Sequence, residues 1–152
     1  MKLSMILSQL SSGMAGTIWI FVLTLVFSLP LGLLIALGRM SKNRIVSGVF
    51  RFYISLMRGT PLMLQLMVVY FGPFYLFGMN IGKWRFPAII TGFALNYGAY
   101  FAEIYRSGII SMDRGQYEAA KLLGSSKVQT FIRIILPQVV KRILPAITNE
   151  VI

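Results

Sequence analysis

Long runs of uncharged, mostly apolar residues alternate along this chain with short basic stretches. No charged residue occurs from position 3 to position 38, and the most apolar part is residues 17–37. As a helix these 21 residues would be about 31 Å long, which matches the hydrocarbon core of a bilayer. Trp19 lies near the start of this stretch, where an aromatic ring suits the membrane interface. We therefore predict a first membrane span here.

This first apolar block is predicted to be a retained span and not a cleaved signal peptide. The block is long for a signal peptide, and no A-x-A cleavage pattern follows it. Arg39, Lys42 and Arg44 come next instead, as in a stop-transfer flank.

Two further uncharged blocks cover residues 59–82 and 86–102. The first predicts a second span over residues 61–79, with Pro61 at the helix start, where its missing N–H is tolerated. The second predicts a third span whose helix continues past Glu103 to about Ile110. The mixed segment 45–57 before them is interpreted as an interfacial or partly buried helix.

Small residues recur every four positions in the first and third predicted spans. Such stripes let two membrane helices approach closely, although chance explains them equally well in a sequence this rich in small residues. The two sets are Ser28, Gly32, Ala36 and Ala94, Gly98, Ala102.

The polar segment 111–138 contains no span and predicts two short helices. Asp113 with Gln116, and Ser126 with Gln129, have the spacing of a helix-capping pair. Gly124 stands where the first of these helices should end. The second helix should end near Pro137 and carry one apolar face, made of Val128, Phe131, Ile132 and Ile135.

The last ten residues, 143–152, are enough for only about 15 Å of helix, half a bilayer. We therefore expect the sequence to stop inside a fourth span, as in a truncated product or a partial sequence. The expected fold is all-α: one polytopic transmembrane helix bundle over residues 1–152, with three full spans and part of a fourth.

Composition supports a membrane protein and disfavours an enzyme. Hydrophobic residues make up 57% of the chain and charged residues 12%, whereas soluble domains carry about a quarter charged residues. Cysteine and histidine are absent, and only four residues are acidic. This excludes disulfides and thiol catalysis, and it removes the commonest general base and metal ligand. No catalytic residue, metal site or bound cofactor is predicted.

The net charge of +11 comes from flanks of the predicted spans. Twelve of the fifteen Lys and Arg residues follow the first and third spans, and three lie on the opposite side. The positive-inside rule then places the N-terminus outside and both basic loops in the cytoplasm. A nucleic-acid-binding protein is disfavoured because these residues bracket apolar segments and do not form one basic face.

The segment 115–138, GQYEAAKLLGSSKVQTFIRIILPQ, carries the most specific pattern in the chain. It resembles the EAA loop of ABC-importer permeases: EAA, three spacers, G, nine spacers, then I-x-LP. The resemblance implies that this cytoplasmic loop, about residues 111–138, is gripped by an ATPase subunit. The residues it assigns to this coupling are Gly115, Gln116, Glu118, Ala119, Ala120, Gly124, Ile134, Leu136 and Pro137. An ordinary surface helical hairpin is the alternative.

Three more segments are similar to the polar amino-acid uptake branch of that family: RGTPL at 58–62, AYFAEI at 99–104, and GQ at 115–116 with LPQ at 136–138. The resemblance implies a type I importer permease of the bacterial plasma (inner) membrane. Its expected partners are a second permease subunit, identical or related, a cytoplasmic ABC ATPase dimer that holds ATP and Mg, and an extracytoplasmic amino-acid-binding protein. The alternatives are a permease for another small solute, such as methionine, an osmolyte or a metal, and a membrane anchor without a transport role.

Polar residues at membrane depth are candidates for the substrate pathway. They are Gln65, Asn96, Asn149 and Glu150. Each could instead form a hydrogen bond between helices. Glu103 and Arg106 stand three apart on one helix, and we expect them to pair with each other.

Overall fold

The computed structural model describes residues 3–78 and 81–152, and throughout this part of the chain the protein is helical and contains no strand. The predicted all-α fold is confirmed. The elements are α1 (Leu3–Arg39), α2 (Arg44–Gly59), α3 (Leu62–Phe77), α4 (Ile81–Ile110), α5 (Arg114–Leu122), α6 (Lys127–Gln129), the π-helix η1 (Thr130–Ile135) and α7 (Leu136–Val151).

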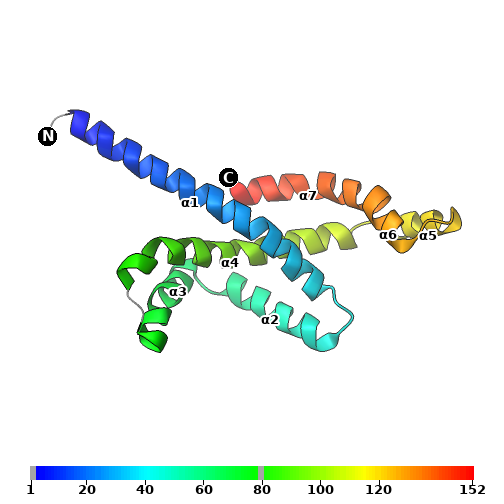
Figure 1. The fold of residues 1–152 in the computed structure, drawn as a ribbon. Helices are drawn as coiled ribbons and strands as arrows, with labels where there is room; N and C mark the ends of the chain where they lie inside the picture. Colours follow the sequence, from blue (N-terminus) through cyan, green and yellow to red (C-terminus); the bar gives the residue numbers. More distant parts are fainter. Residues whose placement is uncertain (1–2, 79–80) are drawn as a thin grey trace.

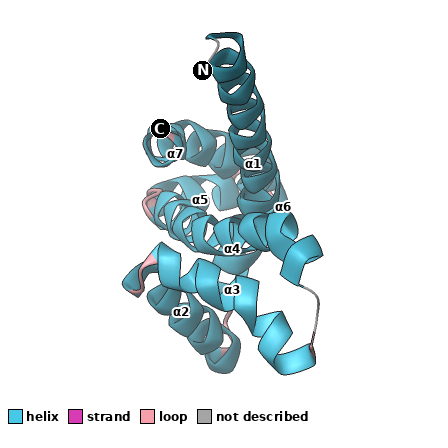
Figure 2. Ribbon diagram, turned by 90° about the vertical axis from the view of Figure 1, so that its left-hand side faces the viewer, coloured by secondary structure: helices cyan, strands magenta, loops and turns pink. Residues whose placement is uncertain are grey.

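The two longest helices, α1 and α4, cross at the centre of the molecule (Figure 1). Their contact uses the two small-residue stripes: Ser28, Ala36 and Ala102 are all buried. A Cβ atom added to Gly32 would lie 2.7 Å from the Cβ of Phe101 and 3.1 Å from the carbonyl oxygen of Gly98. The close approach suggested by the stripes is therefore confirmed. The N-terminal end of α1 projects beyond the other helices (Figures 1 and 2).

The second predicted span is shorter than expected, and the prediction of its bounds is wrong. Pro61 is the N-cap of α3 and not its first residue, and the helix ends at Phe77 because Gly78 adopts a left-handed conformation, φ 65°. Met79, the predicted end, lies outside the described residues. The 16 residues of α3 form about 24 Å of helix, less than the thickness of a bilayer core.

Only α1, from Ser4 to Arg39, is by itself long and apolar enough to cross a membrane among the described helices. Helices α2 and α3 qualify together, as one broken span bent by 111°. Helix α4 does end at Ile110, as predicted. Its polar residues, including Asn96 and Glu103, lower its hydropathy. The count of three full spans and part of a fourth therefore stays a prediction.

The second short helix predicted in segment 111–138 does not stop at Pro137. Instead α6, η1 and α7 follow one another without a break from Lys127 to Val151, with Pro137 in the first turn of α7. Because the arm is continuous, Pro137 stands at the junction of η1 and α7 and not at a free helix end. The described structure thus has one long arm where two separate elements were expected.

The apolar face predicted for this segment is confirmed for Phe131 and Ile135 and wrong for Val128 and Ile132. Val128 and Ile132 are 65% and 54% exposed. Because η1 is a π-helix, its i→i+5 bonds place more residues in each turn than the 3.6 assumed. The residues that pack inward are Ile135, Val139 and Ile143, against Ile104 and Ile109 of α4.

Candidate coupling hairpin and membrane cavity

Helix α5 and the start of the long arm form a hairpin that projects at the end of the molecule away from α3 (Figure 1). The Asp113 carboxylate caps α5 by accepting a hydrogen bond from the backbone N–H of Gly115, at 2.8 Å. Gly124 reverses the chain with φ 75°, a left-handed conformation that favours glycine. Ser126 and Gln129 form a capping box at the start of α6. The predicted helix stop and second cap are confirmed.

The first predicted capping pair is wrong in its partner. Asp113 caps Gly115, but the side chain of Gln116 does not return to the helix start. It forms a reciprocal amide pair with Gln138 of α7, in which each amide NH2 donates to the other's oxygen, at 3.0 and 2.9 Å. Gln138 also donates to the carbonyl oxygen of Ile134. Both glutamines lie in segments that resemble the permease family, GQ at 115–116 and LPQ at 136–138. Their spacing in the sequence did not predict that the two side chains would pair.

The signature residues of the loop divide into an outward and an inward set. Gly115, Glu118 and Ala119 are exposed on α5, and Leu136 and Pro137 are exposed on α7. The inward set comprises Ala120, which is 2% exposed, and Gln116 and Ile134, which are half-buried. Ala120 thus serves the packing of the hairpin, whereas Glu118 and Ala119 are available to another molecule.

A groove of about 620 Å³ runs between α5 and the start of the arm. Glu118 lines it together with Tyr117, Lys121, Lys127 and Phe131. At the hairpin tip, Leu122 and Leu123 are 88% and 84% exposed. Adjacent exposed leucines beside a mixed-charge groove are typical of a surface that another protein covers.

We expect the Gln116–Gln138 pair to tie the hairpin to the arm. The leucine substitutions Gln116→Leu and Gln138→Leu should each destabilise the protein, and the double variant should cost less than the sum of the two. A coupling energy of about 1 kcal/mol is expected, because two net hydrogen bonds are replaced by an apolar contact. Thermal unfolding of the four purified proteins measures it, and additive effects would contradict a direct pair.

A second cavity, of about 180 Å³, lies within the bundle where α1, α4 and α7 meet. Its polar lining includes Thr24 of α1 and Glu150 of α7, and its aromatic lining includes Phe93, Tyr97 and Phe101 of α4. Thr24 is buried, and its hydroxyl has no hydrogen-bond partner among the described residues. Half-buried Glu150 thus shares the cavity lining with three aromatic side chains, and a carboxylate with aromatic rings is a combination that can bind a cationic group.

The other polar candidates lie elsewhere. The Asn96 amide donates to the Gln65 side-chain oxygen at 2.9 Å, and Gln65 in turn donates to the Met57 and Thr60 carbonyl oxygens. Their hydrogen bonds hold the bend between α2 and α3 against α4, as the interhelical alternative proposed. Asn149 is exposed and does not line the cavity beside Glu150.

The expected pair between Glu103 and Arg106 is also present, as an ion pair on α4. In this ion pair the charges of Glu103 and Arg106 offset each other. Neither Thr24 nor Tyr97 was predicted from the sequence as a residue of the cavity that Glu150 lines. Thr24, like Gln65, is a polar residue at membrane depth, and the criterion that selected Gln65 could have selected Thr24 as well.

Comparison with known proteins places these features in a family context. The family model described as "Binding-protein-dependent transport system inner membrane component" matches residues 28–152. The chain is 44% identical, over 131 residues, to a putative glutamine transport system permease protein of Rickettsia bellii, covering 86% of this chain and 59% of the relative. It is 41% identical over 144 residues to the L-cystine transport system permease protein TcyB of Bacillus subtilis, covering 94% and 60%.

An arginine transport system permease protein of Bacillus subtilis is 43% identical over 140 residues, covering 92% of this chain and 63% of the relative. The chain thus spans about 60% of the length of the curated relatives it matches. A crystal structure of an amino acid ABC transporter with histidines has a TM-score of 0.82 and 37% identity, covering 99% of this chain and 71% of that one.

Proposed function

Because this chain belongs to the family of binding-protein-dependent transport system inner membrane components, we propose that residues 1–152 form one membrane domain of an ATP-driven importer of polar amino acids. The observation that carries the proposal is the capped hairpin, which presents Glu118 and Ala119 outward at the family's EAA spacing. Relatives named for glutamine, L-cystine and arginine transport support an amino acid as the cargo.

The partners follow from the same proposal. A cytoplasmic ABC ATPase dimer, which holds ATP and Mg, binds the hairpin, with Ala119 and Glu118 entering its docking surface. A second permease subunit completes the pathway, and an extracytoplasmic binding protein delivers the amino acid. No cofactor site is proposed on the described part of this chain. The hairpin faces the cytoplasm and the N-terminus lies outside, as the excess of Lys and Arg in the loops supports.

The long arm connects the hairpin to the membrane cavity and can transmit motion between them. The hairpin is tied to α7 by the Gln116–Gln138 pair, and Glu150 lies near the far end of the same α7. A displacement of α5 during ATPase closure is therefore carried along one continuous helical arm to the membrane cavity. Rocking of this arm against α1 and α4 exposes the cavity alternately to the two sides of the membrane.

Recognition of the cargo is assigned to the same cavity. The Glu150 carboxylate pairs with the ammonium group of the amino acid. Phe93 and Tyr97 contact the apolar part of the cargo. Gln65 and Asn96 take a positioning role at the bend of α2 and α3 and do not touch the cargo.

Association with the ATPase tests the proposal. Glu118→Gln should weaken co-purification of the ATPase about tenfold, because one charged hydrogen bond, worth about 1.5 kcal/mol, is removed. Gly124→Val should weaken it further, because a β-branched residue is strained at φ 75°. Arg133→Gln, which changes one exposed charge outside the groove, is the control.

A membrane anchor would show no dependence of ATPase association on these residues. Labelling supplies a second test, since the chain has no cysteine of its own. A cysteine at Lys121 should react with a membrane-impermeant maleimide only after the cytoplasmic side is exposed. Reaction from the outer side of intact cells would overturn the proposed coupling.

A further inference from the structure

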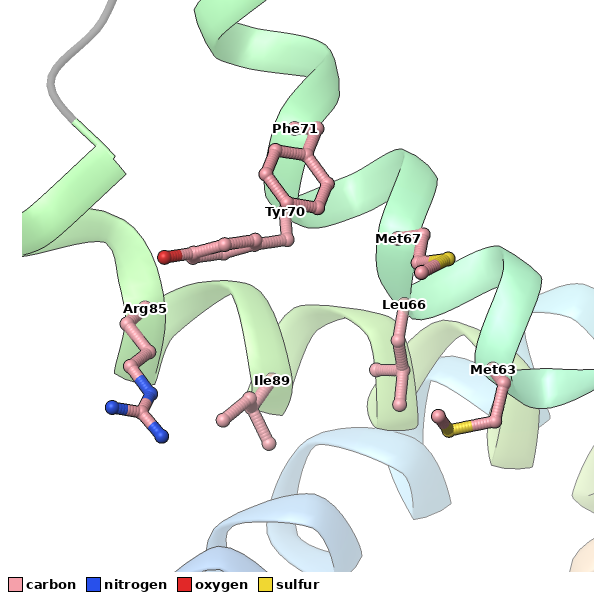
Figure 3. Close-up of a pocket in the computed structure, with 7 residues that line it drawn as sticks. All are labelled: Met63, Leu66, Met67, Tyr70, Phe71, Arg85 and Ile89. Atoms are coloured by element: carbon pink, nitrogen blue, oxygen red, sulfur yellow. The ribbon is translucent and has the colours of Figure 1, made fainter.

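A groove of about 390 Å³ lies between α3 and the first turns of α4, outside the features used so far (Figure 3). Most of its lining is apolar, from Met63, Leu66 and Met67 of α3 and Ile89 of α4. Its size falls within the usual range of small-molecule sites, about 300–1,000 Å³. The groove can therefore hold an elongated apolar group.

One end of this groove is polar. Arg85 and the hydroxyl of Tyr70 lie at that end, and Met63 lies at the other (Figure 3). No carboxylate is found among the described lining residues, so nothing there neutralises the Arg85 guanidinium. The groove is thus built for an amphiphile with an anionic head and an apolar tail.

The surroundings of Arg85 have the character of a membrane interface. The neighbouring Trp84 donates from its indole N–H to the Val69 carbonyl oxygen at 3.0 Å. At the end of α3, Tyr75 and Phe77 are 79% and 77% exposed. Exposed aromatic residues beside Trp and Arg are typical of the headgroup level of a bilayer. The polar end of the groove thus carries the residue types that are found at the depth of lipid phosphates.

We propose that this groove binds an anionic phospholipid, with the phosphate paired to Arg85 and one acyl chain lying against Met63, Leu66 and Ile89. Arginine binds phosphate oxygens in a bidentate manner, and Tyr70 can donate a further hydrogen bond. A zwitterionic lipid carries an additional cation that Arg85 would repel. The bound lipid fills the space between α3 and α4 and braces the bend that Gln65 and Asn96 hold from the other side.

Native mass spectrometry of the assembled membrane complex tests the proposal, with phosphatidylglycerol and phosphatidylcholine added in equal amounts. One phosphatidylglycerol per copy of this chain should survive the collisional activation that removes other lipids. Arg85→Gln should reduce its retention at least fivefold, whereas Arg85→Lys should keep part of it. Met67→Trp, which fills the groove at an exposed position, should also remove it. Arg51→Gln, an exposed arginine away from the groove, should leave retention unchanged.

Equal retention of the two lipids, or unchanged retention in Arg85→Gln, would overturn the proposal. A protein occupant is tested separately with Met67→Cys, the only cysteine the chain would then contain. Crosslinking of this cysteine to another polypeptide of the complex would show that protein covers the groove, and would also overturn it. Neither outcome bears on ATPase docking at the hairpin, so the proposed transport function would stand.

Discussion

Uptake of amino acid is expected to fall at least tenfold when Glu150 is replaced by glutamine in the assembled transporter. Glu150 is the one carboxylate among the described residues that line the cavity between α1, α4 and α7. Glutamine keeps the size of the side chain but removes its charge, so the cargo's ammonium group loses a charge-assisted hydrogen bond. Such bonds contribute about 1.5–3 kcal/mol, which corresponds to about 10- to 150-fold in binding.

The neighbouring residue provides a matched control. Asn149→Ala alters the adjacent position, which is exposed and does not line the cavity, and uptake should stay close to that of the unmodified protein. Radiolabelled uptake into proteoliposomes, normalised to the amount of assembled complex, measures both variants. If Glu150→Gln transported normally while still binding the ATPase, the cavity would be excluded as the cargo site.

A single added methyl group at Gly32 is expected to destabilise the protein by about 2 kcal/mol. The new Cβ would lie 2.7 Å from the Cβ of Phe101, 3.1 Å from the Gly98 carbonyl oxygen and 3.2 Å from the Ala102 backbone nitrogen. Two of these three atoms belong to the backbone of α4, so neither a rotamer change nor a small side-chain shift relieves the overlap. Overpacking of this kind costs about 1–3 kcal/mol. Helices α1 and α4 must therefore separate.

The same substitution elsewhere in α1 should have the opposite sign. Gly16 has no atom within 4 Å of an added Cβ, and alanine is favoured over glycine in a helix by about 1 kcal/mol. Gly16→Ala should therefore be neutral or stabilising, whereas Gly32→Ala lowers the melting temperature by several degrees. Thermal unfolding of the two purified variants decides the point. Equal effects of the two substitutions would contradict a close contact of α1 and α4 at Gly32.

Much of the architecture was predictable because it depends on local chemistry. The first helix was predictable because a long uncharged, apolar run is typical of a helix that spans a bilayer. The hairpin was predictable because Ser126 and Gln129 form a capping box and Gly124 adopts the left-handed conformation that glycine favours. The pairing of Glu103 with Arg106 needs only a separation of three residues on one helix.

The errors have two physical origins, an irregular helix in one case and a distant contact in the other. A helical repeat of 3.6 cannot foresee a π-helix, so Val128 and Ile132 were predicted on the buried face together with Phe131 and Ile135, whereas only Phe131 and Ile135 of these four pack inward. Gln116 was assigned to a local cap, although its partner Gln138 is 22 positions away.

By itself, the sequence determined that this chain is helical and membrane-embedded and that residues 115–138 have the EAA spacing, because hydropathy, charge and turn residues act over short stretches. The tertiary structure alone decided which polar groups are available. It joined Gln65 to Asn96 in a hydrogen bond and placed Glu150 with Thr24 in the lining of one cavity. The reason is that hydrogen-bond satisfaction inside a bundle depends on how helices are packed, and this information is not contained in any one segment.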